Sequence, residues 1–348
     1  MKKILQFILF LGIGSSVLWL VFRQQNAAYQ AQCALDGTPA EQCNLLRKLL
    51  ADFGIANYWL VGLTLVFFTI SNLSRAVRWK MLIEPLGFAP RLSNCFWSIT
   101  VGYFANLGLP RMGEVVRAGT LAKYEKIPAE QLIGTIVVDR LVDMVSLLLL
   151  IGLAFVVEFD TIGNFLQKNI ASKSGGGGSN YLLFAVFFGI FAVILLLFLR
   201  KKITQMPFFQ KIKNIADGFL AGLGSIRQLR SPRWFIFHSV IVWLMYYLQC
   251  YCCLLAFPPT AHLSAHAALM VFVFGTLGMV VPSPGGMGTY HALIILALTS
   301  LYGIGGNDAF SLANISFFSI QIFYNIVMGI TALVVLFFIN KNINRDIV

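Results

Sequence analysis

Charged residues are scarce in this sequence. Asp, Glu, Lys and Arg together make up 11% of the chain, whereas 58% of its residues are hydrophobic. A soluble globular protein carries about 25% charged residues. A chain with so few charges cannot cover a surface that faces water, which excludes a soluble globular protein. The composition indicates instead that most of the chain lies in a lipid bilayer.

Acidic residues are rarer still, with 14 Asp and Glu against 26 Lys and Arg and a net charge of +12. The basic residues cluster beside apolar runs, as in the cytoplasmic loops of membrane proteins. We therefore expect no nucleic-acid partner. The sequence also lacks the P-loop lysine, the HExxH zinc motif and the nucleophile elbow of serine hydrolases. It predicts no cofactor, no metal and no catalytic residues.

Cysteines number six. Cys250, Cys252 and Cys253 lie in an apolar run and are typical of small packing residues. Cys33 and Cys43 lie in the loop after the first apolar run, which the charge pattern places outside the cell. Because an oxidising compartment permits cross-linking there, we predict a Cys33–Cys43 disulfide.

Long apolar runs are abundant, and a helix needs roughly 20 apolar residues to cross a bilayer. Six runs are clear spans: Ile4–Phe22, Ile55–Leu73, Leu132–Val157, Tyr181–Leu199, Trp234–Phe257 and Leu312–Ile339. Two shorter apolar stretches are Ala265–Val281 and Met287–Leu301. The sequence thus predicts an all-α polytopic membrane protein of about eight transmembrane segments, forming one domain over residues 1–348.

The charge pattern predicts the sidedness of the chain. Lys2 and Lys3 favour a cytoplasmic N-terminus, and the loop Arg200–Arg233, with eight basic residues and one acid, is expected on the same side. Arg75 and Arg78 are expected there too, beyond the end of the second span. If Asn94–Leu109 crossed the membrane fully, the basic loop Arg200–Arg233 would lie outside the cell. We therefore predict that Asn94–Leu109 is a re-entrant broken helix, which enters the membrane and returns to the same side.

Two further segments are defined by composition. Residues 205–230 have apolar positions at three- and four-residue steps, which predicts an amphipathic helix on the cytoplasmic membrane surface. The run Gly175–Gly178 makes the outside loop at 158–180 flexible. Whether that glycine run is native or engineered stays open.

Two apolar segments, one in each half, are interrupted by proline and glycine. Asn94–Leu109 ends at Pro110, and Ala265–Val281 ends at the turn containing Pro284, Gly285, Gly286 and Gly288. Such paired broken segments, entering from opposite faces, indicate a transporter-type site. They also suggest the hypothesis that the two halves of the chain form an inverted repeat. Whether Ala265–Val281 crosses fully or is re-entrant stays open.

Charged residues beside the first break form one candidate binding site. Arg111, Glu114 and Arg117 share roughly one face of a helix, and arginine binds phosphate through paired donors. The alternative is a charge cluster at the membrane edge that only fixes topology. We further predict that Arg111 and the Gly285–Gly288 turn face one shared cavity.

A second candidate lies inside an apolar run. Asp139 and Asp143 are one helical turn apart, with Arg140 beside them. Ionised groups within a span are costly and usually mark a function or a buried pair. They could contact substrate, or they could form structural salt bridges to Arg111 or Arg117.

The glycine-rich turn is the third candidate. Glycines let backbone amides approach an anion, and the next helix offers free N–H groups. We therefore include Pro284, Gly285, Gly286, Gly288 and the titratable His291 in the predicted site. The alternative is a tight turn between helices.

Taken in order, the motifs Leu109-Pro110-Arg111-Met112-Gly113-Glu114, Asp139-Arg140 with Asp143, and Pro284-Gly285-Gly286-Met287-Gly288 resemble the lysylphosphatidylglycerol synthase transmembrane region family. These proteins are also called flippase-like. The resemblance implies lipid handling, without the soluble aminoacyl-transferase domain that some members carry. His291 stands where members of that family usually have an acid, a departure consistent with a different headgroup or coupling ion.

We expect a flippase-like protein that binds and translocates an anionic, phosphate-bearing lipid or lipid-linked substrate in a bacterial plasma membrane, with both termini cytoplasmic. Two alternatives remain. The same charged residues could serve a membrane-embedded enzyme that modifies a lipid, or the protein could be a non-catalytic partner of a lipid-synthesis enzyme. Of these, transport is favoured over enzymatic activity.

Overall fold

The computed structural model describes residues 44–108, 112–161, 163, 229–281 and 286–341, with positions 19, 22, 23, 26, 27, 29 and 30. The chain divides into two compact units, and the larger contains Met1–Val157 and Leu229–Val348. Several predictions lie outside the described residues. They are most of the span Ile4–Phe22, the span Tyr181–Leu199, nearly all of the surface helix at 205–230, most of the loop at 158–180 and the Cys33–Cys43 disulfide.

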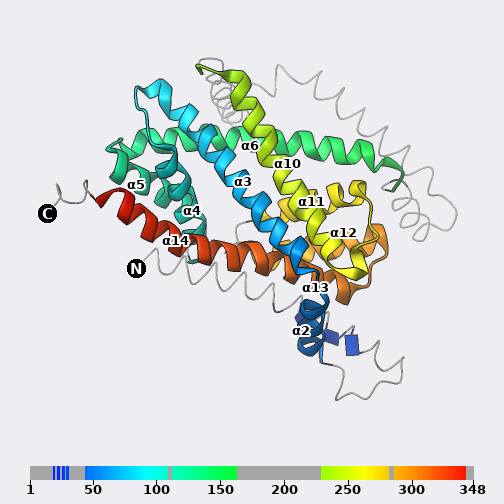
Figure 1. Cartoon of the computed structure of the whole chain (residues 1–348). Helices are drawn as coiled ribbons and strands as arrows, with labels where there is room; N and C mark the ends of the chain where they lie inside the picture. Colours follow the sequence, from blue (N-terminus) through cyan, green and yellow to red (C-terminus); the bar gives the residue numbers. More distant parts are fainter. Residues whose placement is uncertain are drawn as a thin grey trace, which may run out of the picture. The chain divides into compact units, whose positions relative to one another are not determined.

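Every regular element of the described part is helical, and four helices are long and apolar enough to cross a membrane (Figure 1). The first is α3 (Tyr58–Ile83), the second α6 (Ala129–Val157) and the third α10 (Pro232–Ala256). The fourth runs through α13 (Gly306–Phe317), a π-helical segment (Phe318–Tyr324) and α14 (Asn325–Ile339). These helices confirm the prediction of an all-α polytopic membrane protein.

Helix α3 extends ten residues beyond the predicted end of its span at Leu73. The Asn57 side chain caps its first turn by accepting hydrogen bonds from two backbone N–H groups. The helix continues past Leu73 because Arg75 and Arg78 are buried in ion pairs instead of facing water. Placing these two arginines beyond the span was therefore wrong.

The predicted re-entrant element is a helical hairpin of α4 (Leu92–Gly108) and α5 (Gly113–Glu125). The Asn106 side chain accepts a 2.8 Å hydrogen bond from the backbone N–H of Gly113, which closes the start of α5. The two backbones nearly touch at Gly102 and Gly113. A Cβ atom on Gly102 would lie 2.7 Å from the Gly113 carbonyl oxygen, so this crossing requires glycine.

A second hairpin consists of α11 (Ala265–Val280) and α12 (Thr289–Tyr302). The helices cross at Gly278, where a Cβ atom would lie 2.7 Å from the Cα of Tyr290. Gly286 and Gly288 both have φ of +82°, a conformation that favours glycine. Helix α11 has 16 residues, and its length of about 24 Å is less than the roughly 30 Å of a hydrocarbon core. This length favours a hairpin that enters and returns over a full crossing.

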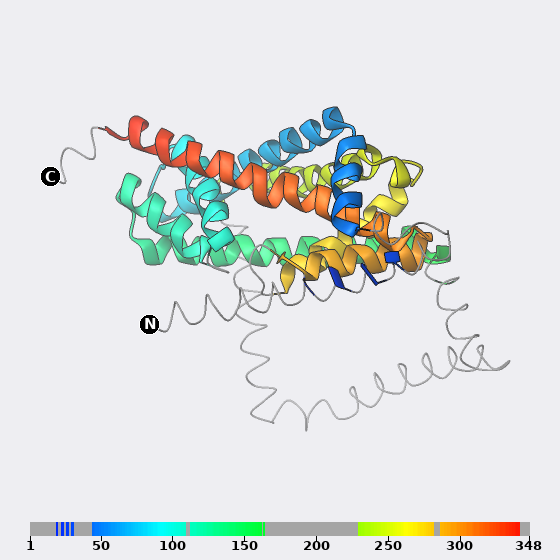
Figure 2. The ribbon, with the colours of Figure 1, turned by 90° about the horizontal axis from the view of Figure 1, so that it is seen from below.

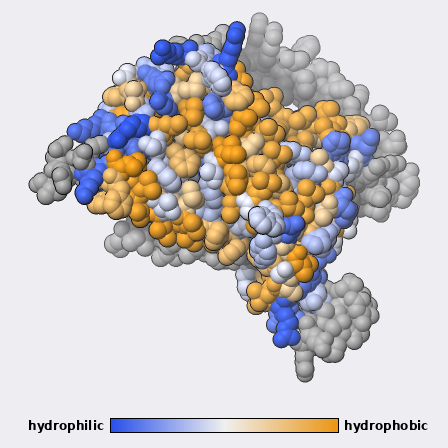
Figure 3. All heavy atoms as spheres, in the orientation of Figure 1, coloured by the Kyte–Doolittle hydropathy of each residue, from blue (hydrophilic) through white to orange (hydrophobic). Residues whose placement is uncertain are grey.

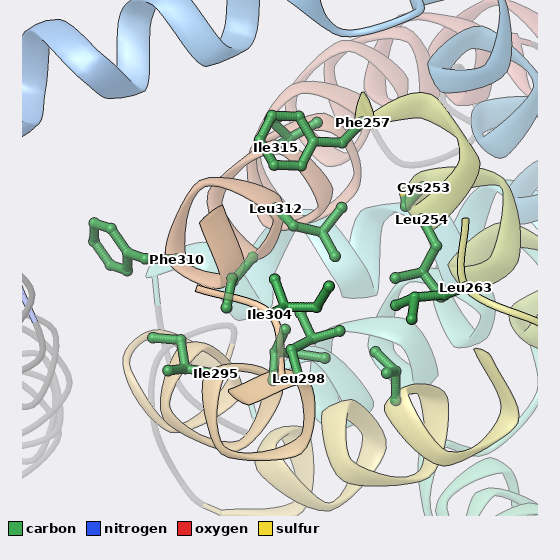
Figure 4. Close-up of a cluster of buried hydrophobic side chains, with 14 of the residues drawn as sticks. Cys253, Leu254, Phe257, Leu263, Ile295, Leu298, Ile304, Phe310, Leu312 and Ile315 are labelled. Carbon is green, nitrogen blue, oxygen red and sulfur yellow. The ribbon is translucent and has the colours of Figure 1, made fainter. Parts of the chain in front are cut away.

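The two hairpins lie against opposite arms of the fourth long helix, as Figures 1 and 2 show. Helix α4 packs along α14, where a Cβ atom on Gly329 would lie 2.5 Å from Phe104. Helix α12 packs along α13. A cluster of buried apolar side chains from α10 to α13 fills the space around α12 (Figure 4). On the surface, a hydrophobic band separates more hydrophilic regions (Figure 3).

One end of the unit is basic. Helices α3, α5 and α14 end there, and helices α4, α6 and α10 begin there. Side-chain contacts join several of these helix ends. Arg91 at the start of α4 hydrogen-bonds to Asn340 after α14, and its Nε lies 3.3 Å from Oε1 of Glu125 in α5. The basic residues of this end are Lys80, Arg91, Lys123, Lys126, Arg230, Arg233 and Lys341.

At the opposite end, helix α2 (Leu45–Ile55) is fastened to α13 by a polar network. Lys48 Nζ lies 2.7 Å from Asp52 Oδ2 and 2.9 Å from Asp308 Oδ1. Ser311 donates a 2.5 Å hydrogen bond to Asp52. Burial acts to lower the pKa of Lys48, but the two carboxylates outweigh it and raise that pKa.

Candidate functional site

Five charged side chains are buried together among the long helices near the basic end. Arg75 and Arg78 come from α3, Arg117 from α5, and Asp139 and Asp143 from α6. None of the five is more than 9% exposed. Ionised groups buried this deeply in a membrane protein need partners, so their contacts determine what the site can do. We call these five residues the arginine cluster.

Each aspartate contacts two or more arginines. Arg75 Nη1 lies 2.6 Å from Asp143 Oδ2 and 3.4 Å from Asp139 Oδ2. Arg78 Nη2 lies 2.6 Å from Oδ1 of both aspartates. Arg117 Nη1 lies 3.3 Å from Asp139 Oδ2. The predicted alternative of a salt bridge to Arg117 is thus confirmed for Asp139.

Aromatic and hydroxyl groups surround the arginine cluster. The Arg117 guanidinium stacks 3.8 Å from the centre of the Trp79 ring, and Trp79 donates a 2.9 Å hydrogen bond to Thr135 of α6. Arg75 donates a 3.5 Å hydrogen bond to the hydroxyl of Tyr246 on α10. That hydroxyl lies 3.4 Å from the hydroxyl of Tyr103 on α4. The cluster is therefore linked directly to α10 and, through Tyr246, to α4.

Positive charge exceeds negative charge in the arginine cluster by one, since three arginines face two aspartates. Several donors also lack an acceptor. Nε and Nη2 of Arg117 have no hydrogen-bond partner among the described residues. Asp139 Oδ1 lies close to Arg78 but accepts no hydrogen bond with good geometry. The arginine cluster therefore has excess positive charge together with buried donors that the described residues leave unpaired.

A second ion pair lies at the surface beside the arginine cluster. Arg140 Nε is 2.6 Å from Glu114 Oε1, and both side chains are more than 40% exposed. Arg140 Nη1 also lies 3.6 Å from Asp143 Oδ2, which links the pair to the cluster. The structure therefore brings together five predicted site residues: Glu114, Arg117, Asp139, Arg140 and Asp143.

Of the remaining predicted residues, Gly286 and Gly288 lie before α12 and His291 lies within it. Arg111, Pro284 and Gly285 lie outside the described residues, so the shared cavity between the two breaks stays a prediction. His291 on α12 is buried against α13, with its ring 4.9 Å from that of Phe317. In the described ranges, no three His, Cys, Asp or Glu side chains come together as metal ligands would.

Sequence reasoning missed Arg75 and Arg78. A spacing of three places them on neighbouring positions of one helix surface, and small or polar residues at 71, 72 and 74 precede them. A helix that carries such a polar stripe directly after an apolar run is itself a signal of a buried site. The charges were assigned instead to the membrane edge, where arginine is more common.

Fold and site together define a multi-pass helical membrane protein in which two interrupted hairpins flank long spans and a buried charged cluster. A family model described as the lysylphosphatidylglycerol synthase TM region matches residues 42–329. The chain belongs to this family, which confirms the resemblance of its motifs.

One curated relative shares part of the chain. It is the UPF0104 membrane protein MJ1595 of Methanocaldococcus jannaschii, 33% identical over 93 residues. The match covers 26% of this chain and 27% of that protein, so it spans about a quarter of the relative. No solved structure matches the chain.

Proposed function

We propose that the protein is a flippase-like lipid transporter whose arginine cluster binds the phosphate of an anionic lipid headgroup. One observation carries the proposal: the cluster holds one more positive than negative charge, and two Arg117 donors have no partner among the described residues. Removing water from an uncompensated charge is costly. A phosphate offers the missing negative charge and several acceptor oxygens. Membership of a lipid-related family supports a lipid as its source.

Access to the arginine cluster requires movement, because its side chains are buried in this state. The α4–α5 hairpin carries Arg117, while α3 and α6 carry the other four charges. Displacement of the hairpin would separate Arg117 from Asp139 and open the cluster toward a headgroup. Glu114 and Arg140 then form a surface gate at the side of the path, since their ion pair joins α5 to α6. No nucleotide motif is present, so gradients or mass action would supply the driving force.

We further propose that the basic end faces the cytoplasm of a bacterial cell and that both termini lie on that side. The proposal rests on the excess of Lys and Arg at that end. In a variant without its native cysteines, Lys126→Cys should react with an impermeant maleimide only after the membrane is opened. Arg47→Cys, at the opposite end, should react in intact cells. The reverse pattern would reject this orientation.

Arg117→Gln tests the binding site, because function and stability should respond differently. The substitution leaves two arginines facing two aspartates, so the buried charge balances and the free energy of unfolding should fall less than it does for Asp139→Asn. Affinity for an anionic short-chain phospholipid should fall at least about tenfold, since hydrogen bonds to a charged group contribute about 1.5–3 kcal/mol. Binding to the purified protein and mass spectrometry of co-purified lipids measure the loss.

Lys123→Gln is the matched control, because it removes one exposed positive charge from the same helix. It should leave lipid affinity nearly unchanged. Equal affinity of wild type and Arg117→Gln would contradict the proposal. Chemical modification of the headgroup by the pure protein would favour a lipid-modifying enzyme. Co-purification with a lipid-synthesis enzyme, without transport by the protein alone, would favour a non-catalytic partner.

A further inference from the structure

Helix α2 turns apolar side chains outward and its acid inward. Leu46 is 58% exposed and Leu50 is 75% exposed, whereas Asp52 is buried against α13. A helix on a surface that faces water normally shows the opposite pattern, with its polar residues outward. Exposed apolar faces rimmed by polar residues mark sites that contact a membrane or another protein. The outward face of α2 is therefore a contact surface that the described residues do not cover.

Charge does not prevent this face from leaving water. The exposed residues of α2 are Leu46, Arg47, Leu50, Ala51, Gly54 and Ile55. Arg47, the one charged residue among them, lies in the first turn, where a long side chain can extend its guanidinium to lipid headgroups. On the inward face, Asp52 contacts Lys48 at 2.7 Å and accepts a 2.5 Å hydrogen bond from Ser311. The inward charges thus have protein partners and do not depend on water.

The exposed face continues directly onto a membrane-crossing helix. Two residues separate Ile55, the end of α2, from Tyr58, the start of α3. Tyr58 is 61% exposed and Trp59 is 90% exposed, and tyrosine and tryptophan gather at membrane–water interfaces. Between the helices, the N–H of Asn57 donates a 2.8 Å hydrogen bond to the carbonyl of Ala256, the last residue of α10. The junction of α2 and α3 therefore lies where two spans meet the membrane edge.

The direction of α2 carries its far end deeper into the membrane. Lys48, in its first half, lies 2.9 Å from Asp308 near the start of α13. Five residues further on, the Phe53 ring packs 6.0 Å from the ring of Phe318. Phe318 is twelve residues beyond the start of α13, which is about 18 Å along the helix axis. Helix α2 thus follows the fourth long helix inward from the end opposite the basic end.

We infer that α2 is an interfacial helix whose exposed apolar face lies among the acyl chains of the leaflet opposite the basic end. Continuity with the surface of α3 and the inward direction of α2 favour lipid over a partner protein. Interfacial helices bury their apolar face by about 5–10 Å. Because the polar network joins α2 to α13, the embedded face also fixes the depth at which the fourth long helix enters the membrane. The inference is independent of the proposed transport function.

Nitroxide labels on single cysteines test the position of this face. The full chain without its native cysteines carries Arg47→Cys, Leu50→Cys or Ile55→Cys, in nanodiscs of phosphatidylcholine and phosphatidylglycerol. Oxygen concentrates in the hydrocarbon, whereas a charged nickel chelate stays in water, so the ratio of their collision rates with the label reports depth. The ratio should be lowest at position 47, higher at 50 and highest at 55.

Two reference positions calibrate the ratio. Ile330→Cys labels an exposed position of α14 within the membrane, and Lys126→Cys labels the basic end in water. The ratio at Leu50→Cys should be closer to that of Ile330→Cys, and Leu46→Cys gives a second measurement if Leu50→Cys does not fold. A ratio equal to that of Lys126→Cys would place the face in water and overturn the inference. Labels shielded from both reagents would show that a second copy or another protein covers the face, which would also overturn it.

Discussion

Asp139→Asn is expected to lower the free energy of unfolding by about 3–5 kcal/mol, the cost of removing one partner from a buried ion pair. Asp139 lies within 3.4 Å of Arg75, Arg78 and Arg117 and is completely buried. Asparagine keeps the shape but removes the charge, so the excess positive charge of the cluster rises from one to two. Unfolding in mixed micelles or bicelles measures the loss.

Two controls separate charge balance from packing. Glu114→Gln removes a carboxylate from the exposed pair with Arg140 and should cost less than about 1 kcal/mol. Adding Arg117→Met to Asp139→Asn restores the excess of one charge and should recover much of the stability, but not lipid binding. Equal stability of Asp139→Asn and Glu114→Gln would show that the cluster does not hold the helices together.

Gly113→Ala should disrupt the α4–α5 hairpin, although it adds a single carbon atom. That atom would collide with the Gly102 carbonyl oxygen and lie 2.6 Å from Cγ of Asn106. The backbones would have to separate, and overpacking of this kind typically costs about 1–3 kcal/mol. Arg117, one turn further along α5, would move away from Asp139 as well. We therefore expect reduced stability together with reduced lipid binding.

Gly119→Ala supplies the same substitution on the same helix, where a Cβ atom meets nothing within 4 Å. Alanine is favoured over glycine inside a helix by about 0.5–1 kcal/mol, so this variant should be as stable as wild type or more so. Folding yield and unfolding free energy of the two variants compare the sites directly. Comparable behaviour of the two would mean that the close crossing at Gly102 is not required.

The helices and their breaks could be predicted because they depend on local chemistry. Long apolar runs predict spans, and Pro110 and the turn before Gly288 mark where helices cannot continue. The re-entrant path of the first hairpin, which a count of charges on either side predicts, stays a prediction. These features need no knowledge of which helices touch.

The arginine cluster could be predicted only in part, because its pairs are formed between distant segments. Asp139 and Asp143 were found because they interrupt an apolar run. Arg75 lies 68 residues before Asp143, and nothing local shows that the two meet.

The fourth long helix gives the fold a mechanical consequence. Its 34 residues extend for about 51 Å, much more than the roughly 30 Å of hydrocarbon, so in a bilayer it either tilts or projects beyond the hydrocarbon. Helix α4 rests on one arm, α12 rests on the other, and the π-helical segment lies between them. Because the two arms belong to one continuous helix, a tilt that moved one arm toward its membrane face would move the other arm away. We therefore expect the two hairpins to move in opposite directions if this helix tilts.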